Sequence, residues 1–505
     1  MRVLASLPLF LMLMGLFSVS MVAPAALALG QDGFHDARSF FYAGLGGLVL
    51  TSFVGLATAG RETQRSSLRQ LVALLGVFVL LPAFLAVPFH EAVRTTSFVN
   101  AYFEMVSSLT TTGASLFEPS RLSDAEHLWR AQVGWIGGYL MWVAAAAILA
   151  PLALGGFEVT ASSEPGQVLL SGSAQADSAD PAKRLLRSAR MLAPVYGGLT
   201  LALWLMLLVA GDTPFVALCH AMSVLATSGI SPVGGLSGSQ SGIAGEMLMF
   251  LFMFFALSRL TFSNDTMNTG RPGLRHDPEF RAGLAVIVIV PALLILRHWV
   301  AAFETGDEED LVALAQALWG SLFTVMSFLT TTGFESVNWD DARGWSGLET
   351  PGMILMGLAL IGGGVATTAG GVKLLRVLAL YLNGVREIER LIHPSSVGRA
   401  NTFTRRIRRE GAFIAWVFFM LFAMTLALYT TIFGLMGVRF EHAILMSVAG
   451  LSNAGPLVTV TVAEQPLGLL GQPGYVKMLF ASAMVLGRLE LLAIIVMLTP
   501  DAWRD

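Results

Sequence analysis

The stretch Phe328-Leu329-Thr330-Thr331-Thr332-Gly333-Phe334-Glu335 ends an apolar segment, and the chain repeats this design four times. A near-identical copy reads Ser108-Leu109-Thr110-Thr111-Thr112-Gly113-Ala114-Ser115. Two looser copies read Val224-Leu225-Ala226-Thr227-Ser228-Gly229-Ile230-Ser231 and Gly450-Leu451-Ser452-Asn453-Ala454-Gly455-Pro456-Leu457. The central glycines recur at intervals of roughly 100 to 120 residues, which predicts a fourfold internal repeat.

The composition is typical of a polytopic membrane protein. Of the 505 residues, 55% are hydrophobic and 13% are charged, and the mean hydropathy is +0.69. A soluble domain cannot bury so much apolar surface, whereas a bilayer accepts it. The net charge of −3 provides no basic face, so nucleic acid is not an expected partner. Cys219 is the only cysteine, which excludes an intrachain disulfide and a cysteine-based metal site.

The first 65 residues are expected to form an N-terminal transmembrane hairpin, 1–65. Residues 3–29 are apolar and exceed the roughly 7–15 residues of a signal-peptide core, so we expect a retained helix. The Ala-Leu-Ala run at 26–28 suits a signal peptidase, and cleavage therefore stays open as an alternative. Residues 40–59 are expected to form the returning helix.

One unit follows the hairpin four times: a long helix, a short apolar segment that ends in the glycine motif, and a second long helix. The units are expected at 66–160, 184–265, 266–390 and 391–505, with a cytoplasmic linker at 161–183. Their helices are expected at about 70–89, 97–110 and 131–154; 186–210, 214–226 and 243–262; 281–303, 312–330 and 351–380; and 411–436, 439–452 and 475–498.

The lengths of these segments predict how they sit in the membrane. The long segments reach the roughly 20 residues needed to cross a bilayer, but most segments before the glycines are too short and must re-enter. The predicted fold is therefore an all-α polytopic membrane protein. It consists of the hairpin and four pseudo-symmetric helix–pore-loop–helix units around one central pore, with about ten transmembrane helices.

Charged residues indicate the orientation of the chain. Basic residues gather in the connections before units two, three and four, at 183–190, 271–281 and 386–409. The positive-inside rule places these connections in the cytoplasm. Acidic residues such as Asp212 and Asp340 lie in the opposite connections, so both termini are expected to be cytoplasmic.

The glycine motifs are candidates for an ion filter. A short helix that stops inside the membrane leaves unpaired carbonyls at the negative end of its dipole. Four such ends around one axis present rings of oxygen to a dehydrating cation, and glycine adopts the backbone conformations that this requires. For a single copy, an ordinary helix C-cap with glycine at C′ is the alternative, but four copies favour the filter. The candidate filter residues are Thr111, Thr112, Gly113, Thr227, Ser228, Gly229, Thr331, Thr332, Gly333, Asn453, Ala454 and Gly455.

The motifs, the repeated unit and the stretch Gly362-Gly363-Gly364-Val365-Ala366-Thr367-Thr368-Ala369-Gly370-Gly371-Val372-Lys373 together resemble the Trk/Ktr/HKT superfamily of cation transporters. The runs Leu486-Gly487-Arg488-Leu489-Glu490 and Ile392-His393-Pro394 and the hairpin are similar, more narrowly, to bacterial TrkH-type subunits. The resemblance covers nearly the whole chain. It implies potassium uptake across the bacterial inner membrane, by a channel or symporter route, with K⁺ at the filter as the only metal ion and no cofactor.

The resemblance also bears on selectivity and on partners. Gly113, where sodium-selective members tend to carry serine, implies potassium, while the second and fourth motifs depart from the threonine-rich pattern. The implied partners are a second copy in a homodimer and a cytoplasmic nucleotide-binding regulatory ring. The ring must be a separate polypeptide, because this chain has no glycine-rich nucleotide fingerprint. The basic stretch 386–409 enforces topology and contacts membrane lipid, or docks on that ring.

A glycine-rich run at 362–371 is expected to break the second helix of unit three. A packing kink is one interpretation, and the resemblance implies an intramembrane gating loop below the filter. Arg488 is expected to act as a fixed charge beneath the filter or to pair with an unidentified carboxylate, since Glu490 lies on another helix face. The candidate gate residues are Gly362, Gly363, Gly364, Thr367, Thr368, Gly370, Gly371, Lys373 and Arg488.

Three alternatives to potassium uptake stay open. One is a sodium-selective or poorly selective transporter of the same fold. Another is a membrane-embedded enzyme, which lacks a convergent nucleophile and base in this sequence. The third is a proton-coupled symporter, for which Glu104 is the candidate intramembrane carboxylate. Glu335, which follows the third motif, is expected either to concentrate cations at the outer mouth or to be solvated surface.

Overall fold

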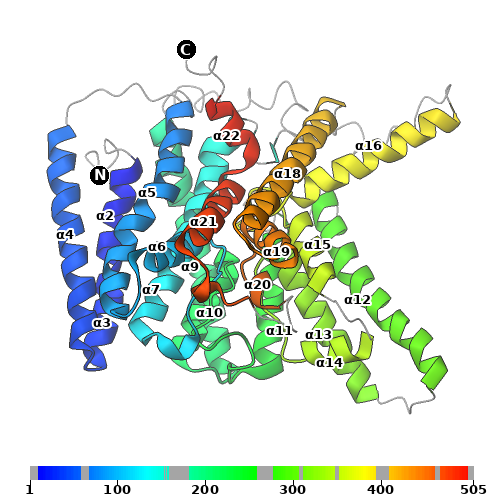
Figure 1. The fold of residues 1–505 in the computed structure, drawn as a ribbon, viewed down its shortest axis with the longest axis horizontal. Coiled ribbons are helices and arrows are strands. Elements are labelled where there is room, and N and C mark those ends of the chain that lie inside the picture. The colour runs from blue at the N-terminus through cyan, green and yellow to red at the C-terminus, as the bar shows by residue number, and fades with distance from the viewer. Residues whose placement is uncertain are drawn as a thin grey trace.

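The computed structural model describes residues 9–58, 67–152, 154, 156–157, 181–258, 277–305, 311–346, 352–393, 409–460 and 467–498 (Figure 1). Within these ranges the regular structure is helical, without a strand, so the predicted all-α fold is confirmed. Most of the expected linker at 161–183 lies outside the described residues, and so do residues 1–8 of the expected hairpin.

The N-terminal hairpin consists of three helices, α2 (Leu9–Ser20), α3 (Val22–Gly30) and α4 (Phe34–Thr58). The single helix expected over 3–29 is therefore divided at Met21. α4 packs along both α2 and α3 and lies at the left edge in Figure 1. The rings of Phe17 and Phe40 lie 6.3 and 5.8 Å from the ring of Trp129 in unit one, so aromatic contacts dock the hairpin on the repeat units.

Each expected unit contains a long first helix, a pore helix before the glycine motif and a second helix. The first helices are α5 (Ser67–Val93), α9 (Pro181–Val209), α12 (Pro278–Thr305) and α18 (Arg409–Leu435). The pore helices are α6 (Phe98–Leu109), α10 (Pro214–Ala226), α13 (Leu311–Leu329) and α19 (Phe440–Leu451). The second helices begin with α7 (Asp124–Ala144), α11 (Gly242–Met253), α15 (Gly352–Ile361) and α21 (Gly474–Leu489).

Local sequence signals set the starts of these helices. Ser97 caps α6 by accepting a hydrogen bond from the N–H of Asn100. α10 begins with Pro214 at its first position, where the missing N–H has no partner to lose. Ser123 and Glu126 form a reciprocal capping box at the start of α7. The pore helices and the second helices of units two, three and four thus begin within one residue of the expected positions, whereas α7 begins seven residues before the expected residue 131.

None of the four second helices runs as one unbroken α-helix to its expected end, whereas the sequence predicted an interruption in unit three alone. α7 passes into a π-helix, η2 (Ala145–Leu149), and α11 into a short 3-10 turn, η5 (Phe254–Ala256). α15 stops at Ile361, and the chain becomes helical again in α16 (Leu374–Ile392). α21 stops before Glu490, whose φ of +65° breaks the helix ahead of α22 (Leu491–Leu498). A left-handed residue or a π-bulge shifts the hydrogen-bond ladder, which the hydrophobic pattern does not reveal.

Eight helices of the described residues are long and apolar enough to cross a membrane. They lie at Leu9–Gly30, Phe34–Thr58, Gln70–Val93, Asp124–Leu149, Arg184–Val209, Pro278–Leu296, Val312–Leu329 and Gly411–Leu435. The expected number was about ten. Three expected spans, the second helices α11, α15 and α21, are shorter than a full span, while the pore helix α13 is long enough to be counted among the eight.

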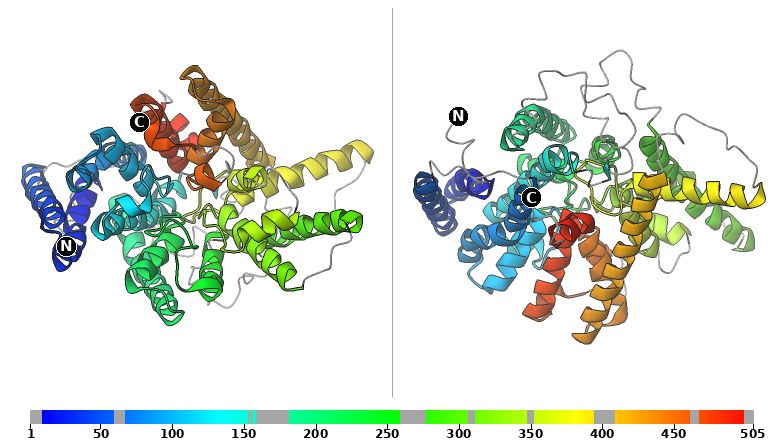
Figure 2. Two further views of the ribbon diagram at one scale, coloured as in Figure 1. Left: turned by 60° about the horizontal axis from the view of Figure 1, so that its bottom comes forward. Right: turned by 90° about the horizontal axis from the view of Figure 1, so that it is seen from above.

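The four units form a closed ring. The second helix of each unit packs on the pore helix of the next: α7 on α10, α11 on α13, α15 on α19 and α21 on α6. The last contact closes the ring, with the rings of Phe103 and Phe480 5.6 Å apart. In the left view of Figure 2 the colours run round the centre from cyan through green and yellow to orange and red. The four glycine motifs therefore meet at one centre.

Candidate ion pathway

Every pore helix ends in the same turn, two residues before its glycine. Thr111, Thr227, Thr331 and Asn453 all have left-handed backbones, with φ from +51° to +56°. In each loop the next N–H donates to the carbonyl five residues back, as in a Schellman cap. The left-handed C′ residue is thus a threonine or asparagine, and the alternative cap with glycine at C′ is wrong.

These four left-handed residues are strained. Left-handed backbone costs an L-residue roughly 1–2 kcal/mol, and β-branched threonine is a particularly poor fit. The surrounding structure must therefore compensate for this conformation at four equivalent places. Strain of this kind is concentrated at functional sites, which singles out the ends of the pore helices.

The central glycines lie against neighbouring loops in a cyclic order. A Cβ placed on Gly113 would lie 1.7 Å from the carbonyl oxygen of Ser228, and one on Gly229 would lie 2.3 Å from that of Thr332. A Cβ on Gly333 would meet Pro456 at 2.7 Å, and one on Gly455 would meet Ala114 at 2.2 Å. Loop one therefore contacts loop two, two contacts three, three contacts four, and four contacts one. No residue larger than glycine fits without a backbone shift.

Loops one and three share a hydroxyl pair that the other two lack. The hydroxyl oxygens of Thr110 and Thr112 lie 2.8 Å apart, and those of Thr330 and Thr332 lie 2.9 Å apart. Both pairs follow directly from the repeated Thr-Thr-Thr-Gly sequence. The predicted departure from fourfold side-chain symmetry is present.

Loop four is attached to loop one. The N–H of Gly455 donates to the carbonyl oxygen of Thr112 at 2.7 Å. The side-chain amide of Asn453 donates to the hydroxyl of Thr112 at 3.0 Å and to the carbonyl of Met484 in α21 at 2.9 Å. Loop four has no threonine pair, and the side-chain amide of Asn453 holds it in place instead.

A non-helical loop, residues 362–373, lies between α15 and α16. Gly362 and Gly371 have φ of +74° and +79°, and the N–H of Val372 donates back to Leu360 at 2.9 Å, so the loop returns toward its own start. Its first half is held from behind, because the N–H of Val365 donates to the Glu279 carboxylate at 2.6 Å. We call residues 362–373 the central loop.

The tip of the central loop contacts the inner ends of three filter loops. The N–H of Gly370 donates to the hydroxyl of left-handed Thr331 at 2.8 Å. A Cβ on Gly370 would lie 2.0 Å from the carbonyl oxygen of Ser452 in loop four. The hydroxyl of Thr368 donates to the carbonyl of Leu225, beside loop two, at 3.2 Å. The central loop therefore sits directly against the meeting point of the motifs.

The basic candidate residues hold the second half of the central loop. The guanidinium of Arg488 donates to the carbonyl of Thr368 at 2.7 Å, and the ammonium of Lys373 donates to the carbonyl of Ala369. The two nitrogens of Arg488 other than Nη1 have no hydrogen-bond partner among the described residues. Glu490 pairs instead with Arg376 at 2.7 Å, as its different helix face predicted.

This arrangement has counterparts in known proteins. Residues 274–502 match the family model described as "TrkH: Cation transport protein". The chain is 30% identical over 509 residues to the Trk system potassium uptake protein TrkH of Halomonas elongata, with 98% of both chains covered. It is 28% identical to the protein of the same name from Vibrio parahaemolyticus, again over 98% of both. The chain belongs to the TrkH family of cation transport proteins.

The fold agrees with this membership. The structure matches the crystal structure of the potassium transporter TrkH from Vibrio parahaemolyticus with a TM-score of 0.79 and 25% identity, over 100% of both chains. The TrkH family transports cations and is not a family of enzymes, which rules out the membrane-embedded enzyme. A multi-pass membrane protein is established by the same similarity together with the apolar helices.

Two buried carboxylates, Glu104 and Glu246, stand behind loops one and three of this TrkH-family chain. Glu104 accepts from the N–H of Leu116 at 2.5 Å and lies 3.0 Å from the guanidinium of Arg130. Glu246 accepts from the N–H of Val337 at 2.6 Å and from the indole of Trp319 at 2.8 Å. Each carboxylate fixes the backbone three or four residues beyond a filter glycine. Glu104 is therefore engaged in structure, which weakens the symporter alternative.

Sequence reasoning missed the supporting role of Glu246 and of a similar group behind loop two, Asp212 and His220. Glu246 is far in sequence from the segment it holds, since it bonds residues 336 and 337, and Asp212 bonds residues 239 and 240. The one available signal was an acidic residue inside an apolar helix, which is rare unless it is partnered.

An outer cavity of about 770 Å³ opens above the four glycines. Its walls include Glu118, Arg121, Glu335 and Asp340. Glu335 is half-buried rather than freely solvated, which contradicts the solvated-surface interpretation. Burial, and next the charge of Asp340, raise the pKa of Glu335 to about 7. The charge at this mouth therefore changes near neutral pH.

Proposed function

We propose that this chain takes up potassium ions across the bacterial inner membrane through a filter formed by its four glycine motifs. The observation that carries the proposal is the cyclic contact of Gly113, Gly229, Gly333 and Gly455 with their neighbours. Four pore-helix ends at one centre concentrate carbonyl oxygens and the negative ends of four dipoles, as a dehydrating cation requires. The choice of potassium as the ion is supported by the relatives that match along their full length, which are named potassium uptake proteins.

The filter itself would consist of the left-handed residue, the residue after it and the glycine of each motif. Backbone carbonyls would bind the ion, and the hydroxyl pairs of loops one and three would hold those loops in place. The residues concerned are Thr111, Thr112, Gly113, Thr227, Ser228, Gly229, Thr331, Thr332, Gly333, Asn453, Ala454 and Gly455.

The central loop would be the gate, drawn here in its closed position. Its contacts with Thr331 and Ser452 put backbone where an ion leaving the filter must pass. Opening would break the Arg488 bond to Thr368 and move the glycine-rich segment aside. The gate would comprise Gly362, Gly363, Gly364, Thr367, Thr368, Gly370, Gly371, Lys373 and Arg488.

Membrane potential would drive uptake. Each elementary charge gains about 2.3 kcal/mol per 100 mV of inside-negative potential. By the positive-inside rule, the basic connections would lie in the cytoplasm together with the gate side and both termini. The cation then meets the outer cavity first, the filter second and the gate last. The domain division at 1–65, 66–160, 184–265, 266–390 and 391–505 follows the same functional units.

Assembly would involve a second copy and a cytoplasmic nucleotide-binding ring. Helix α16 projects from the body in Figure 1 and carries an exposed apolar stripe of Tyr381, Ile388, Leu391 and Ile392. An amphipathic helix with such a face suits a protein partner at the membrane surface. The names of the relatives refer to a Trk system, which is consistent with further subunits.

Sodium-selective or weakly selective transport is the alternative function. The observation that favours it is the absence from loops two and four of the threonine pairs seen in loops one and three. A filter held less firmly on two sides discriminates less between ions of different radius.

Flux into proteoliposomes at a clamped membrane potential tests the proposal. Purified protein should pass potassium in preference to sodium, with the cytoplasmic partner added where the protein alone is closed. Equal rates for both ions would support the weakly selective alternative. No flux by folded protein with its partner would contradict cation uptake.

A further inference from the structure

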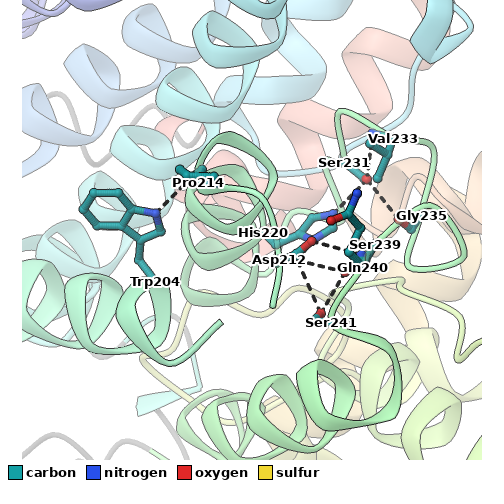
Figure 3. A network of polar contacts seen from close by, with 10 residues as sticks. All are labelled: Trp204, Asp212, Pro214, His220, Ser231, Val233, Gly235, Ser239, Gln240 and Ser241. Atoms are coloured by element: carbon teal, nitrogen blue, oxygen red, sulfur yellow. Dashed lines mark hydrogen bonds and ion pairs between the residues drawn. The ribbon is translucent and has the colours of Figure 1, made fainter. Parts of the chain in front are cut away.

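Loop two has a polar support that none of the candidate filter residues provides (Figure 3). His220 is fully buried on pore helix α10, and its Nε2 lies 2.9 Å from the hydroxyl of Ser231, two residues beyond Gly229. The edge of its ring meets the ring of Phe334 at 5.5 Å, and Phe334 directly follows Gly333. One side chain therefore contacts the outer ends of loops two and three.

The hydroxyl of Ser231 is the centre of the contacts that follow Gly229. It lies 3.2 Å from the carbonyl of Gly235 and accepts from the N–H of Val233 at 3.2 Å. Its contact with Nε2 of His220 is shorter, at 2.9 Å, and the tautomer of the imidazole decides which of the two atoms donates. In either tautomer His220 makes one hydrogen bond to loop two.

Asp212 fixes the other side of this network. Its carboxylate lies 3.8 Å from Nδ1 of His220 and accepts from the hydroxyl of Ser239 at 2.8 Å and the N–H of Gln240 at 3.1 Å. Burial acts to raise the pKa of Asp212, but His220, Ser239 and Gln240 together hold that pKa below its usual value. The carboxylate is therefore an anion. It is hydrogen-bonded to the segment that follows loop two, and it lies beside the histidine ring, beyond hydrogen-bond distance from Nδ1.

Loop two depends on this support because its own hydroxyls make fewer hydrogen bonds across the loop than those of loops one and three. The Thr227 hydroxyl donates to the carbonyl of its neighbour Ala226 rather than across the loop. The remaining contact is between the hydroxyls of Ser223 and Ser228 at 3.1 Å. The threonine pairs that hold loops one and three are missing here.

We infer that His220 is a positioning residue for ion selectivity, which sets the spacing of filter loops two and three through Ser231 and Phe334. The inference rests on the proposed function. His220 does not touch the ion. It acts on the backbone that follows Gly229, and thereby on the width of the filter between the four loops. Loss of the Nε2–Ser231 hydrogen bond should widen the filter at loop two and admit sodium.

A double-mutant cycle tests the inference. His220→Phe keeps the contact with Phe334 and removes the hydrogen bond from one side, Ser231→Ala removes it from the other, and His220→Gln supplies a side chain that can donate or accept. We expect His220→Phe and Ser231→Ala each to lower the potassium-to-sodium permeability ratio about fivefold, as loss of one hydrogen bond would. The double variant should be no worse than either single variant, because both remove the same bond. His220→Gln should recover most of the ratio.

The control is Trp204→Phe. The Trp204 indole donates to the carbonyl of Pro214 at 3.0 Å, at the start of the same pore helix and apart from loop two (Figure 3). Its loss should leave the permeability ratio unchanged. Permeability ratios are compared at equal amounts of folded protein, and potassium-dependent thermal stabilisation provides a second measurement for any variant with little flux.

The outcomes separate the inference from the proposed function. Unchanged ratios in folded His220→Phe, or additive losses in the double variant, would overturn the positioning role while potassium uptake stands. An equal loss in Trp204→Phe would reduce His220 to general support of the helix and overturn the inference as well. Failure of the wild-type protein to pass any alkali cation would contradict both.

Discussion

The backbone N–H of Gly370 donates a hydrogen bond of 2.8 Å to the hydroxyl oxygen of Thr331. Thr331 is one of the four left-handed residues at the pore-helix ends, and Gly370 is at the tip of the central loop. The candidate filter and the candidate gate are therefore joined by one direct bond. A movement of the central loop can therefore act on filter loop three directly, without an intermediate residue.

Replacing Thr331 with valine should loosen the gate. Valine keeps the shape of threonine but cannot accept from Gly370, and one hydrogen bond contributes about 1 kcal/mol. Basal potassium flux without the activating partner should therefore rise about fivefold. Thr111→Val is the matched control, because the Thr111 hydroxyl has no hydrogen-bond partner in the described part of the chain. Equal effects of the two substitutions would argue against a direct link.

Arg488→Gln should open the gate further. The bond from Arg488 to the carbonyl of Thr368 is charge-assisted and buried, and such bonds contribute about 1.5–3 kcal/mol. We expect basal flux to rise at least about tenfold in liposomes at a clamped potential. Arg439→Gln, in an exposed pair with Glu441, serves as the control and should have little effect. A closed Arg488→Gln protein would show that this bond does not hold the loop.

Uptake from low potassium should depend on external pH through Glu335. Because its pKa is raised to about 7, this carboxyl is mainly neutral at pH 6 and mainly charged at pH 8. Initial rates at subsaturating potassium should therefore rise between these two pH values. Glu335→Gln should remove the rise and remain at the low rate. The exposed neighbour Asp341 provides the control, since Asp341→Asn should keep the wild-type pH profile.

The same shift has a consequence for stability. A carboxyl with a raised folded-state pKa opposes folding once it must be charged, so its cost grows as pH rises from its unfolded value of about 4.5 through 7. Thermal unfolding should show Glu335→Gln gaining stability relative to the wild type at pH 8 and not at pH 4. A stability difference between the two proteins that stays constant from pH 4 to pH 8 would show that Glu335 does not have the raised pKa.

Gly113→Ala should damage the filter. The added Cβ would lie 1.7 Å from the carbonyl oxygen of Ser228, and the φ of +76° disfavours any side chain. Discrimination between potassium and sodium should be lost, together with much of the flux. Gly46→Ala is the control, because no atom lies within 4 Å of its added Cβ. Normal selectivity in Gly113→Ala would remove loop one from the filter.

The repeat units and pore helices were predictable because the bilayer limits segment lengths and the glycine motif is written four times. The expected pore segment 97–110 is α6, Phe98–Leu109, and the expected segment 214–226 is α10, Pro214–Ala226. The break in the third unit was also predictable, since several glycines together cannot continue a helix. These features depend on local sequence.

Features that depend on distant contacts were not predictable. Nothing near Thr331 indicates its left-handed backbone, which the surrounding loops impose. Glu490 pairs with Arg376, and Val365 is held by Glu279, across separations that hydrophobic patterns do not encode. The break at Glu490 was also missed, because no glycine or proline stands at Glu490 or directly beside it.

The position of the transported ion would show whether the four glycine motifs form the filter. Crystals of the protein grown with thallium or rubidium, which replace potassium and scatter anomalously, would locate it. We predict anomalous density on the axis between the four motifs, surrounded by Gly113, Gly229, Gly333 and Gly455, and none at that point in sodium alone. Density at another site with none between the motifs would contradict a filter at these glycines.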